Sequence, residues 1–425
     1  MRRSLVLLAA VAALPVLAVM RVHPRASKTY LPPSLDDFYR RADGFESAAN
    51  GEILKSRSVQ YKTTAATGEP DTTIATLFKP LVPADPPRIL LLMPLPDSAC
   101  IDCTVSYAYV PHRDPLNASL TRLSIANNPT TVHDLLAGLA KGWYVAVPDH
   151  GGSKAGWLAG VNEAFAGLDG LRAMLNHRAT LPSSDGYQAV LRGYSGGAHA
   201  AARASQYLES LEAFSGGAFS SLPTAALGGL ANVYPELATW LNASLNDKGH
   251  AALRQARSEC YIFEVGLEVA SFFTNGCAAF DEDVPRRYFP SEDLGVPRTA
   301  PTGDATDGVI RIPTLMYHSS SDELVPFAHV ERYFASQCAR GGNGQLVSTA
   351  ASEHVTALLI FLGDALVFLE NAFEGRLGNE GQGCSRRDSL VAPLFSQVYI
   401  DAVGGQAWEQ IRGLNLTDVT DYPSA

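Results

Sequence analysis

Ser195 has the sequence surroundings of a nucleophile. It lies in Gly193-Tyr194-Ser195-Gly196-Gly197, the only Gly-x-Ser-x-Gly motif in the 425 residues. In this motif the serine occupies a sharp turn between a strand and a helix, and the outer glycines remove side chains that would clash there. The hydroxyl would attack a carbonyl carbon, and the N–H of Gly196 would stabilise the oxyanion. The alternative is a glycine turn with an ordinary serine, because 36 glycines make chance matches common.

A serine nucleophile needs a histidine to take its proton and an acid to orient that histidine. Where the motif lies on a strand-to-helix turn, both come after the serine in the chain, the acid first. His354 fits, because it lies in the polar segment Ala351-Ser352-Glu353-His354 between a predicted strand and a long apolar helix. The other histidines after Ser195 fall in predicted helices, a cap or a strand: His199, His250, His318 and His329.

Asp322 is the predicted acid. It comes shortly after a predicted strand and precedes Glu323-Leu324-Val325-Pro326, so a loop at the end of the strand would present it. Glu323 is the neighbouring alternative. Asp304 and Asp307 precede the strand and are placed less well.

A second oxyanion donor is expected from the loop after an early strand. Leu95-Pro96-Asp97-Ser98 comes after the apolar run 88–93, so the backbone N–H of Asp97 is the candidate. The alternative is an aspartate that only forms a turn. Asp149-His150-Gly151-Gly152 also ends a predicted strand. Because His150 precedes Ser195, we interpret this loop as packed support beneath the nucleophile turn.

Apolar runs and helical spacings predict the elements that hold these residues. Residues 58–62 and 73–78 indicate an antiparallel pair of strands. The runs 88–93 and 143–148 are almost wholly apolar, which is typical of strands buried on both faces of a parallel sheet. Further strands are expected at 187–192, 314–318 and 345–348, and helices at 161–177, 198–211 and 355–373. This alternation predicts an α/β protein with the α/β-hydrolase fold, whose mostly parallel central sheet starts antiparallel.

Residues 215–313 lack a clear buried parallel strand and are rich in Ala, Leu, Phe and Tyr. We expect them to form an inserted, mainly helical cap or lid. Its apolar side chains, among them Leu230, Leu237 and Trp240, either pack within the cap or favour a lipid acyl chain beneath it. The expected organisation is a signal peptide at 1–20, a core at 21–214 and 314–385, the cap at 215–313, and a tail or flap at 386–425.

The N-terminus indicates export. Arg2 and Arg3 precede an uncharged apolar run from Leu5 to Met20, with a small-residue cleavage site near Ala18. An uncleaved membrane anchor is the weaker alternative, because about 20 apolar residues are needed to span a bilayer. Asn117, Asn242 and Asn415 lie in sequons for glycosylation. The net charge of −10, without a Lys/Arg stripe, argues against nucleic-acid binding.

The cysteines form an even set, which predicts three disulfides in an exported chain: Cys100, Cys103, Cys260, Cys277, Cys338 and Cys384. Zinc is the weaker alternative. Cys100-x-x-Cys103 has the spacing of zinc ligands, but no second cysteine pair or nearby histidine pair completes a tetrahedral site. No metal or other cofactor is expected.

Four parts of the sequence together resemble the fungal secretory lipase family. They are the octapeptide Gly193–Ala200, Asp149–Gly160, Ser321–Pro326 and Glu353–Ala357. The resemblance spans about residues 35–385, and the octapeptide is far more specific than the Gly-x-Ser-x-Gly motif alone. It implies an enzyme that hydrolyses carboxylic esters, including triacylglycerols, without metal, beneath a helical lid and a C-terminal flap. Gly151 and the residue before Asp97 depart from the family pattern, which has acidic residues there.

The resemblance also implies roles for individual residues. Ser195, Asp322 and His354 match the family's triad, and Asp97 and Gly196 its oxyanion hole. It implies the disulfides Cys103–Cys260 and Cys338–Cys384, which leaves Cys100 and Cys277 as a third candidate pair.

We therefore predict a secreted, extracellular triacylglycerol lipase that meets its lipid or ester substrate without a stable membrane span. One alternative is a short-chain or polyester esterase, or a peptidase, on the same fold. An alternative from another class is a secreted binding protein that keeps the hydrolase scaffold but has no activity.

Overall fold

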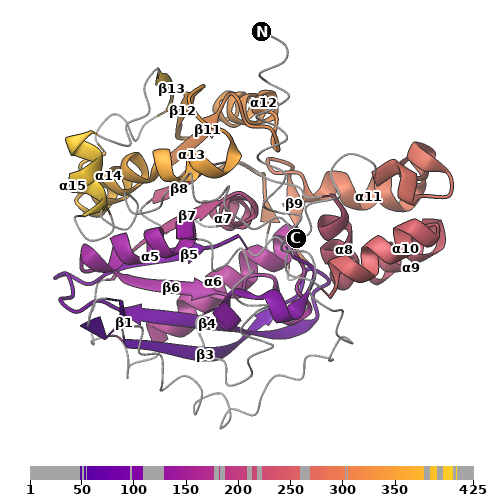
Figure 1. Ribbon diagram of the computed structural model, residues 1–425, viewed down its shortest axis with the longest axis horizontal. Helices are drawn as coiled ribbons and strands as arrows, with labels where there is room; N and C mark the ends of the chain where they lie inside the picture. The colour runs from indigo at the N-terminus through magenta and orange to yellow at the C-terminus, as the bar shows by residue number, and fades with distance from the viewer. Residues whose placement is uncertain are drawn as a thin grey trace, which may run out of the picture.

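The main element of the computed structural model is a sheet of nine strands. The structure describes residues 48–49, 52–53, 55–95, 98–108, 129–176, 181, 187–207, 213–217, 223–258, 269–301, 303, 305–377, 383–389, 396–404 and 408. The strand order is β13-β12-β11-β8-β7-β5-β6-β4-β3 (Figure 1). The strands are β3 (Lys55–Thr64), β4 (Pro70–Lys79), β5 (Arg88–Met93), β6 (Tyr144–Pro148), β7 (Gln188–Tyr194), β8 (Ala213–Gly217), β11 (Thr314–Ser319), β12 (Gly344–Thr349) and β13 (Cys384–Ser389). Two short pairs stand apart: β1 (Ala48–Ala49) with β2 (Glu52–Ile53), and β9 (Arg298–Thr299) with β10 (Ala305–Thr306).

The sheet starts antiparallel and continues parallel. β3 pairs with β4, and β4 with β6, in antiparallel register. From β6 to β13 all neighbouring strands are parallel. The predicted antiparallel start is confirmed, although β3 and β4 extend up to three residues beyond the predicted runs 58–62 and 73–78. The predicted strands 88–93, 314–318 and 345–348 are confirmed to within a residue at either end.

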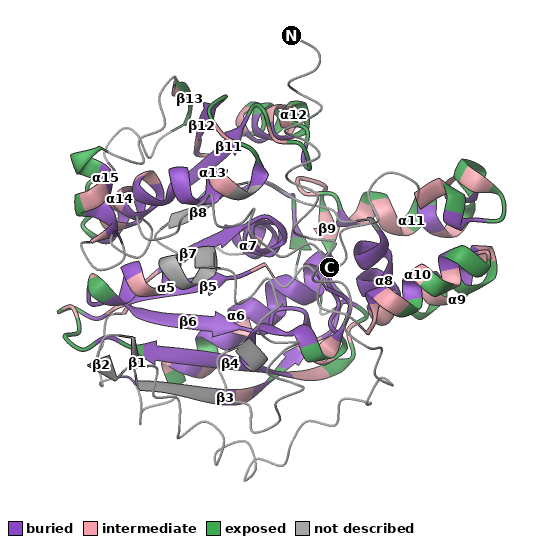
Figure 2. Ribbon diagram, viewed as in Figure 1, coloured by how far each residue is buried: buried purple, intermediate pink, exposed green. Residues whose placement is uncertain are grey.

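Helices cover both faces of the sheet, because successive side chains of its buried strands point to opposite sides. In β5, Leu90 and Leu92 pack in one core cluster with α5 (Pro129–Ala140), α13 (His354–Ile360), α14 (Leu362–Phe373) and α15 (Gln397–Val403). Ile89 and Leu91 pack in the other with α6 (Gly160–Asn176), α7 (Gly196–Gln206) and α12 (Phe327–Ala339). The described residues thus form three layers, in which the central strands β5, β6 and β11 are buried (Figure 2).

The predicted helix 355–373 is two helices, α13 and α14, which meet at Phe361. There the backbone has φ −93° and ψ 1°, and the Phe361 N–H still bonds to the carbonyl of Ala357. Residues 357–363 carry no polar side chain, so the spacing of apolar residues does not indicate the break.

The predicted cap is mainly helical in its described part. α8 (Pro223–Val233), α9 (Pro235–Ser244), α10 (Asp247–Ala256) and α11 (Asp283–Glu292) project together from one side of the molecule (Figure 1). We call residues 223–292 the helical insert. Its apolar side chains, among them Leu237 and Trp240, form a core cluster that also includes Val161 and Phe165 of α6.

The prediction that residues 215–313 lack a parallel strand of the sheet is wrong at their start. β8 lies between β7 and β11 and is parallel to both. Its sequence, Ala-Phe-Ser-Gly-Gly, is short and glycine-rich, and glycine weakens the strand signal.

The C-terminal segment also contributes to the core. β13 is the last strand of the sheet, and a disulfide between Cys338 and Cys384 joins it to α12. Its exposed charged side chains suit an edge strand, because they discourage pairing with other chains. Tyr399 of α15 is buried and donates a hydrogen bond to the carbonyl of Leu359. The described part of residues 386–425 therefore packs on the core.

The other four cysteines belong to two predicted pairs, of which the described residues cover one only in part and contradict the other. Cys103 is disulfide-bonded, but Cys260, its predicted partner, lies outside the described residues. Cys277 is exposed and has a free thiol, so the candidate pair Cys100–Cys277 is wrong. Cys100 is buried and comes directly after Ala99, whose carbonyl accepts a hydrogen bond from Asn232 of α8, whereas Cys277 is exposed on the short helix η5 (Gly276–Asp281). A buried and an exposed thiol cannot bond without movement of the backbone.

Candidate active site

Ser195 occupies a strained turn between β7 and α7. Its φ of 52° and ψ of −126° lie where non-glycine residues are rare. A Cβ on Gly193 would lie 2.2 Å from the carbonyl oxygen of Gly197, and one on Gly197 would lie 2.2 Å from that of Met93. The two glycines therefore allow α7 to start directly against the ends of β7 and β5. Ser195 itself is buried, with 1% of its surface exposed.

His354 and Asp322 approach Ser195 in an unbroken hydrogen-bonded chain. The Oγ of Ser195 lies 3.0 Å from Nε2 of His354, and Nδ1 of the same ring lies 2.8 Å from Oδ2 of Asp322. Asp322 comes after β11, and His354 comes after β12 as the first residue of α13. Because these strands are adjacent and parallel, their carboxyl ends bring the acid and the histidine to the same edge of the sheet.

The Asp322 carboxylate is buried and held in its charged form. Burial alone would raise its pKa, but the His354 ring, the N–H of Val325 and the nearby His318 lower it below its ordinary value. The other carboxylate oxygen accepts the N–H groups of Leu324 and Val325, at 2.9 and 2.7 Å. The acid is therefore fixed in position and ready to keep Nδ1 of His354 protonated.

The side chains of Glu323 and Tyr194 hold the backbone of His354. Glu323, the alternative acid, accepts the N–H of His354 at 3.0 Å and so binds its main chain. The hydroxyl of Tyr194, next to the nucleophile, donates to the carbonyl of His354 at 2.7 Å. Ser319, at the end of β11, also donates to the carbonyl of Ser352 in the same loop. In the sequence, these contacts are indicated only by position: Tyr194 precedes Ser195, and Glu323 follows Asp322.

The remaining predicted site residues lie in several environments. Gly196 is the first residue of α7, where backbone N–H groups make no bond within the helix. Asp97, Asp304, Asn117 and Asn415 lie outside the described residues. Asp307 forms an exposed ion pair with Arg311, and Asn242 is exposed on α9.

Neither a metal site nor a membrane span is found in the described part of the chain. These residues contain no group of three His, Cys, Asp or Glu side chains that could hold a metal ion. Within the same residues, no helix is both long and apolar enough to cross a bilayer.

A buried polar network lies beneath the nucleophile turn. Glu163, fully buried in α6, contacts Nδ1 of His199 in α7 at 2.9 Å and Nδ1 of His150 at 3.4 Å. The His150 ring in turn binds the carbonyl of Pro94 through Nε2, at 2.9 Å. The sequence predicts a packed, supporting role for the loop of His150 but does not assign Glu163 to it. A glutamate beside the apolar residues Val161, Ala164 and Phe165 was the available signal.

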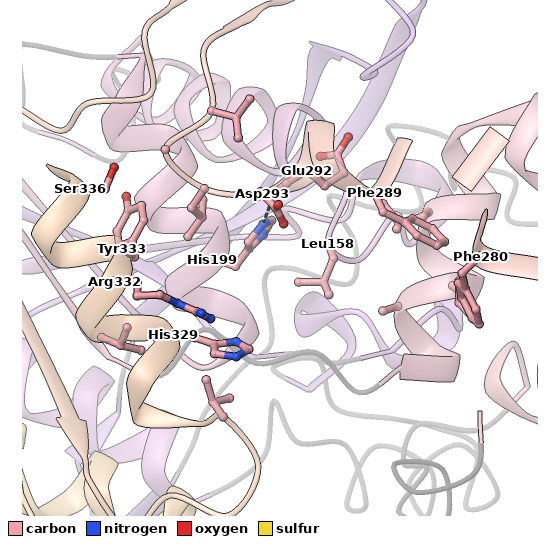
Figure 3. A pocket seen from close by; sticks show the side chains of 18 of the residues that line it. Leu158, His199, Phe280, Phe289, Glu292, Asp293, His329, Arg332, Tyr333 and Ser336 are labelled. Atoms are coloured by element: carbon pink, nitrogen blue, oxygen red, sulfur yellow. Dashed lines mark hydrogen bonds between the residues drawn. The ribbon is translucent and has the colours of Figure 1, made fainter. Parts of the chain in front are cut away.

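A cavity of about 770 Å³ lies between the helical insert and α12 (Figure 3). The insert contributes Leu227, Leu230, Phe280 and Phe289 to its wall, and α12 contributes Val330 and Tyr333. Polar groups also line it: His199, Glu292, Asp293, His329 and Arg332. Val325, whose N–H binds Asp322, is another lining residue, so the cavity borders the loop of the acid.

Several fungal lipases of similar length are similar to this chain over most of its sequence. Lipase A of Moesziomyces aphidis is 28% identical, over 97% of this chain and 96% of the relative. A secreted triacylglycerol lipase of Malassezia furfur is also 28% identical, over 92% of each chain. Lipase 2 of Candida albicans is 26% identical, over 86% of this chain and 85% of the relative.

The fold of this chain is also similar to that of a lipase and an esterase of known structure. The crystal structure of Candida antarctica lipase A matches with a TM-score of 0.72 and 26% identity, over 85% of this chain and 86% of that chain. A rice cell wall degrading esterase from Xanthomonas oryzae, 17% identical, covers 77% of this chain and 94% of its own, with a TM-score of 0.52; at that identity it shows the fold alone. The family model for secretory lipases matches residues 117–211 and 207–381, more than half of the sequence. The chain therefore belongs to the secretory lipase family and is a lipase, a carboxylic ester hydrolase.

Proposed function

We propose that this lipase hydrolyses triacylglycerols through a Ser195–His354–Asp322 triad and an acyl-enzyme intermediate. The observation that carries the proposal is the chain of two hydrogen bonds, 3.0 Å from Ser195 to His354 and 2.8 Å from His354 to Asp322. The strained turn at Ser195 adds support, because backbone strain of this kind clusters at functional sites.

In the proposed mechanism, Nε2 of His354 removes the proton of Ser195 while Oγ forms a bond to the ester carbonyl carbon. Asp322 keeps Nδ1 protonated and stabilises the imidazolium. The N–H groups of Gly196 and Asp97 would bind the oxyanion. His354 then returns its proton to the leaving alcohol as the ester C–O bond breaks, and a water molecule activated by the same ring releases the carboxylic acid.

The proposed substrate is a glycerol ester with an extended acyl chain. The cavity beside Asp322 supports this, because its volume and its leucine and phenylalanine side chains suit an apolar group. In this proposal the helical insert acts as a lid over the site, and residues beyond 386 contribute a flap. The name of the Malassezia furfur relative, a secreted triacylglycerol lipase, points to the same substrate class.

Export belongs to the same proposal. Residues 1–20 would direct the chain to the secretory pathway and be removed, and Asn117, Asn242 and Asn415 would be glycosylated. The exposure of Asn242 on α9 supports the middle site.

The substrate class is tested with p-nitrophenyl esters from acetyl to palmitoyl, together with an emulsified triacylglycerol. We expect hydrolysis of long-chain esters and release of fatty acid from the emulsion. A maximum at acetyl or butyryl without attack on the emulsion would reduce the proposal to an esterase. Cleavage of peptides in preference to esters would favour a peptidase.

The nucleophile is tested separately by labelling with a fluorophosphonate and locating the modified peptide by mass spectrometry. We expect the label on Ser195. A folded protein that takes no label would instead indicate a binding protein on a hydrolase scaffold.

A further inference from the structure

Asp149 and His150, at the end of β6, contact both ends of the segment that comes after β5. Nε2 of His150 donates to the carbonyl of Pro94 at 2.9 Å. The carboxylate of Asp149 accepts the N–H of Ser106 at 2.7 Å and its hydroxyl at 2.5 Å. We propose that these two side chains are positioning residues that fix Pro94 and Ser106, the described ends of the oxyanion segment (residues 94–106), relative to Ser195. The inference rests on the proposed function, in which Asp97 of this segment supplies an oxyanion donor.

The surroundings of His150 favour a proton on both ring nitrogens. A carbonyl oxygen such as that of Pro94 only accepts hydrogen bonds, so Nε2 must donate. Nδ1 lies 3.4 Å from a carboxylate oxygen of Glu163, which also only accepts. Both side chains are buried, so an unprotonated Nδ1 would face a negative charge without water between them. Burial lowers the pKa of His150, but Glu163, the Pro94 carbonyl and Asp149 raise it above its ordinary value.

Glu163 is itself fixed. Its Oε1 accepts the N–H of Leu158 at 3.1 Å, and its Oε2 lies 2.9 Å from Nδ1 of His199 on α7. The helix α7 starts directly after Ser195. Glu163 therefore links this helix, through His199, to His150, whose ring binds the Pro94 carbonyl.

The Pro94 carbonyl lies directly against the nucleophile turn. A Cβ on Gly197 would lie 2.6 Å from that oxygen. The hydrogen bond from His150 therefore fixes the start of the oxyanion segment at its contact with α7, and Asp149 fixes the segment where α3 (Val105–Ala108) begins. A displacement of about 1 Å in a group that aligns the reaction costs about 100-fold in rate.

Four variants separate positioning from a general effect on folding. His150→Leu removes both donors, whereas His150→Gln keeps an amide that can donate to Pro94. Asp149→Asn weakens the other contact. Tyr61→Phe is the matched control, because it removes a buried hydroxyl that donates to the backbone carbonyl of Ala166 at 2.5 Å, and it leaves the side chains that bind Pro94 and Ser106 in place.

For each variant we would measure kcat and KM on p-nitrophenyl butyrate, the affinity for a phenylboronic acid and the thermal unfolding midpoint. The boronic acid forms a tetrahedral adduct with the nucleophile and so reports the oxyanion site. Fluorophosphonate labelling of Ser195 in the wild type is recorded first. Its absence would contradict the proposed function itself and not this inference.

We expect His150→Leu to lower kcat and boronate affinity by the same factor, about 10- to 100-fold, with KM changed less than about twofold. His150→Gln should recover most of that loss, and Asp149→Asn should lower the same two quantities. Tyr61→Phe should change only the unfolding midpoint. Equal kcat and boronate affinity in His150→Leu and Tyr61→Phe would overturn the inference. If His150→Leu does not fold, wild-type values in both His150→Gln and Asp149→Asn would overturn it.

Discussion

His318 lies 3.5 Å from the Asp322 carboxylate oxygen that His354 contacts at 2.8 Å. The Nε2 of His318 also lies 2.9 Å from the carbonyl of Val325, so this nitrogen carries a proton. Burial lowers the pKa of His318 and keeps the ring neutral. His318 and His354 therefore both contact the Asp322 carboxylate, but the ring of His354 is the one in contact with Ser195.

Replacing the acid should reveal its role in orienting His354. Asp322→Asn should lower kcat by about 10⁴-fold, because the amide no longer selects the ring form with a proton on Nδ1. KM should change little, since the Asp322 side chain is buried beneath the ring. Steady-state kinetics on p-nitrophenyl butyrate measure both quantities.

Glu323→Gln is the matched control for that variant. The Glu323 side chain contacts the N–H of His354, and a glutamine oxygen can accept the same bond. We expect kcat within about tenfold of the wild type, since one neutral hydrogen bond replaces a charged one. A larger loss for Glu323→Gln than for Asp322→Asn would make Glu323 the acid.

Gly197→Ala should lower kcat more than it lowers the thermal unfolding midpoint. The added Cβ would lie 2.2 Å from the Met93 oxygen and 2.6 Å from the Pro94 oxygen, both backbone atoms that must move. Their movement shifts the start of the oxyanion segment, so we expect kcat to fall at least about 100-fold. Gly341→Ala is the control: its φ of 82° is strained for alanine, but nothing lies within 4 Å of the new methyl. It should lower the unfolding midpoint at wild-type kcat, and the reverse pattern would contradict the account.

The buried network gives a pH dependence of stability with a defined sign. Burial alone would raise the pKa of Glu163, but His150 and His199 lower it to about 2 from 4.5. A carboxyl whose pKa is lowered in the folded state stabilises the fold above its unfolded pKa, and this contribution is lost as pH falls from about 4.5 to about 2. The shift corresponds to about 3 kcal/mol.

Urea unfolding of the wild type and Glu163→Gln at pH 6, 4 and 3 tests this contribution. The wild type should lose its advantage over the variant as pH falls. Asp149 provides the comparison of opposite sign, because burial raises its pKa from 3.8 to about 6. Its contribution is present below pH 3.8 and declines as pH rises to about 6. Parallel pH profiles for the wild type and Glu163→Gln would contradict the assigned network.

Strand order explains how far the sequence could predict this site. Asp322 and His354 each come after a strand, and adjacent strands of a parallel sheet end at one edge, where the loops after them meet. The contacts of Glu163 with His150 and His199 could not be predicted in the same way. They join a helix, a strand end and the nucleophile helix, and no local periodicity encodes which buried polar groups will meet.

The missed elements also have physical causes. β8 has too few apolar residues to show the pattern of a buried strand, although the sheet contains it between β7 and β11. β13 is rich in exposed charged residues, which suits an edge strand, and its sequence therefore predicted a tail and not a strand. The break at Phe361 lies within residues 357–363, which carry no polar side chain, so the spacing of apolar residues cannot indicate where one helix ends and the next begins.

The central claim, that Ser195 is the nucleophile, is tested most directly by Ser195→Ala. The matched control is Ser205→Ala in α7, the helix that starts after Ser195; the buried hydroxyl of Ser205 donates to the carbonyl of Ala201 at 2.9 Å. We expect kcat on p-nitrophenyl esters to fall about 10⁶-fold in Ser195→Ala, with an unchanged unfolding midpoint, and to stay near wild type in Ser205→Ala. Ester hydrolysis by a folded Ser195→Ala protein at the wild-type rate would contradict the account.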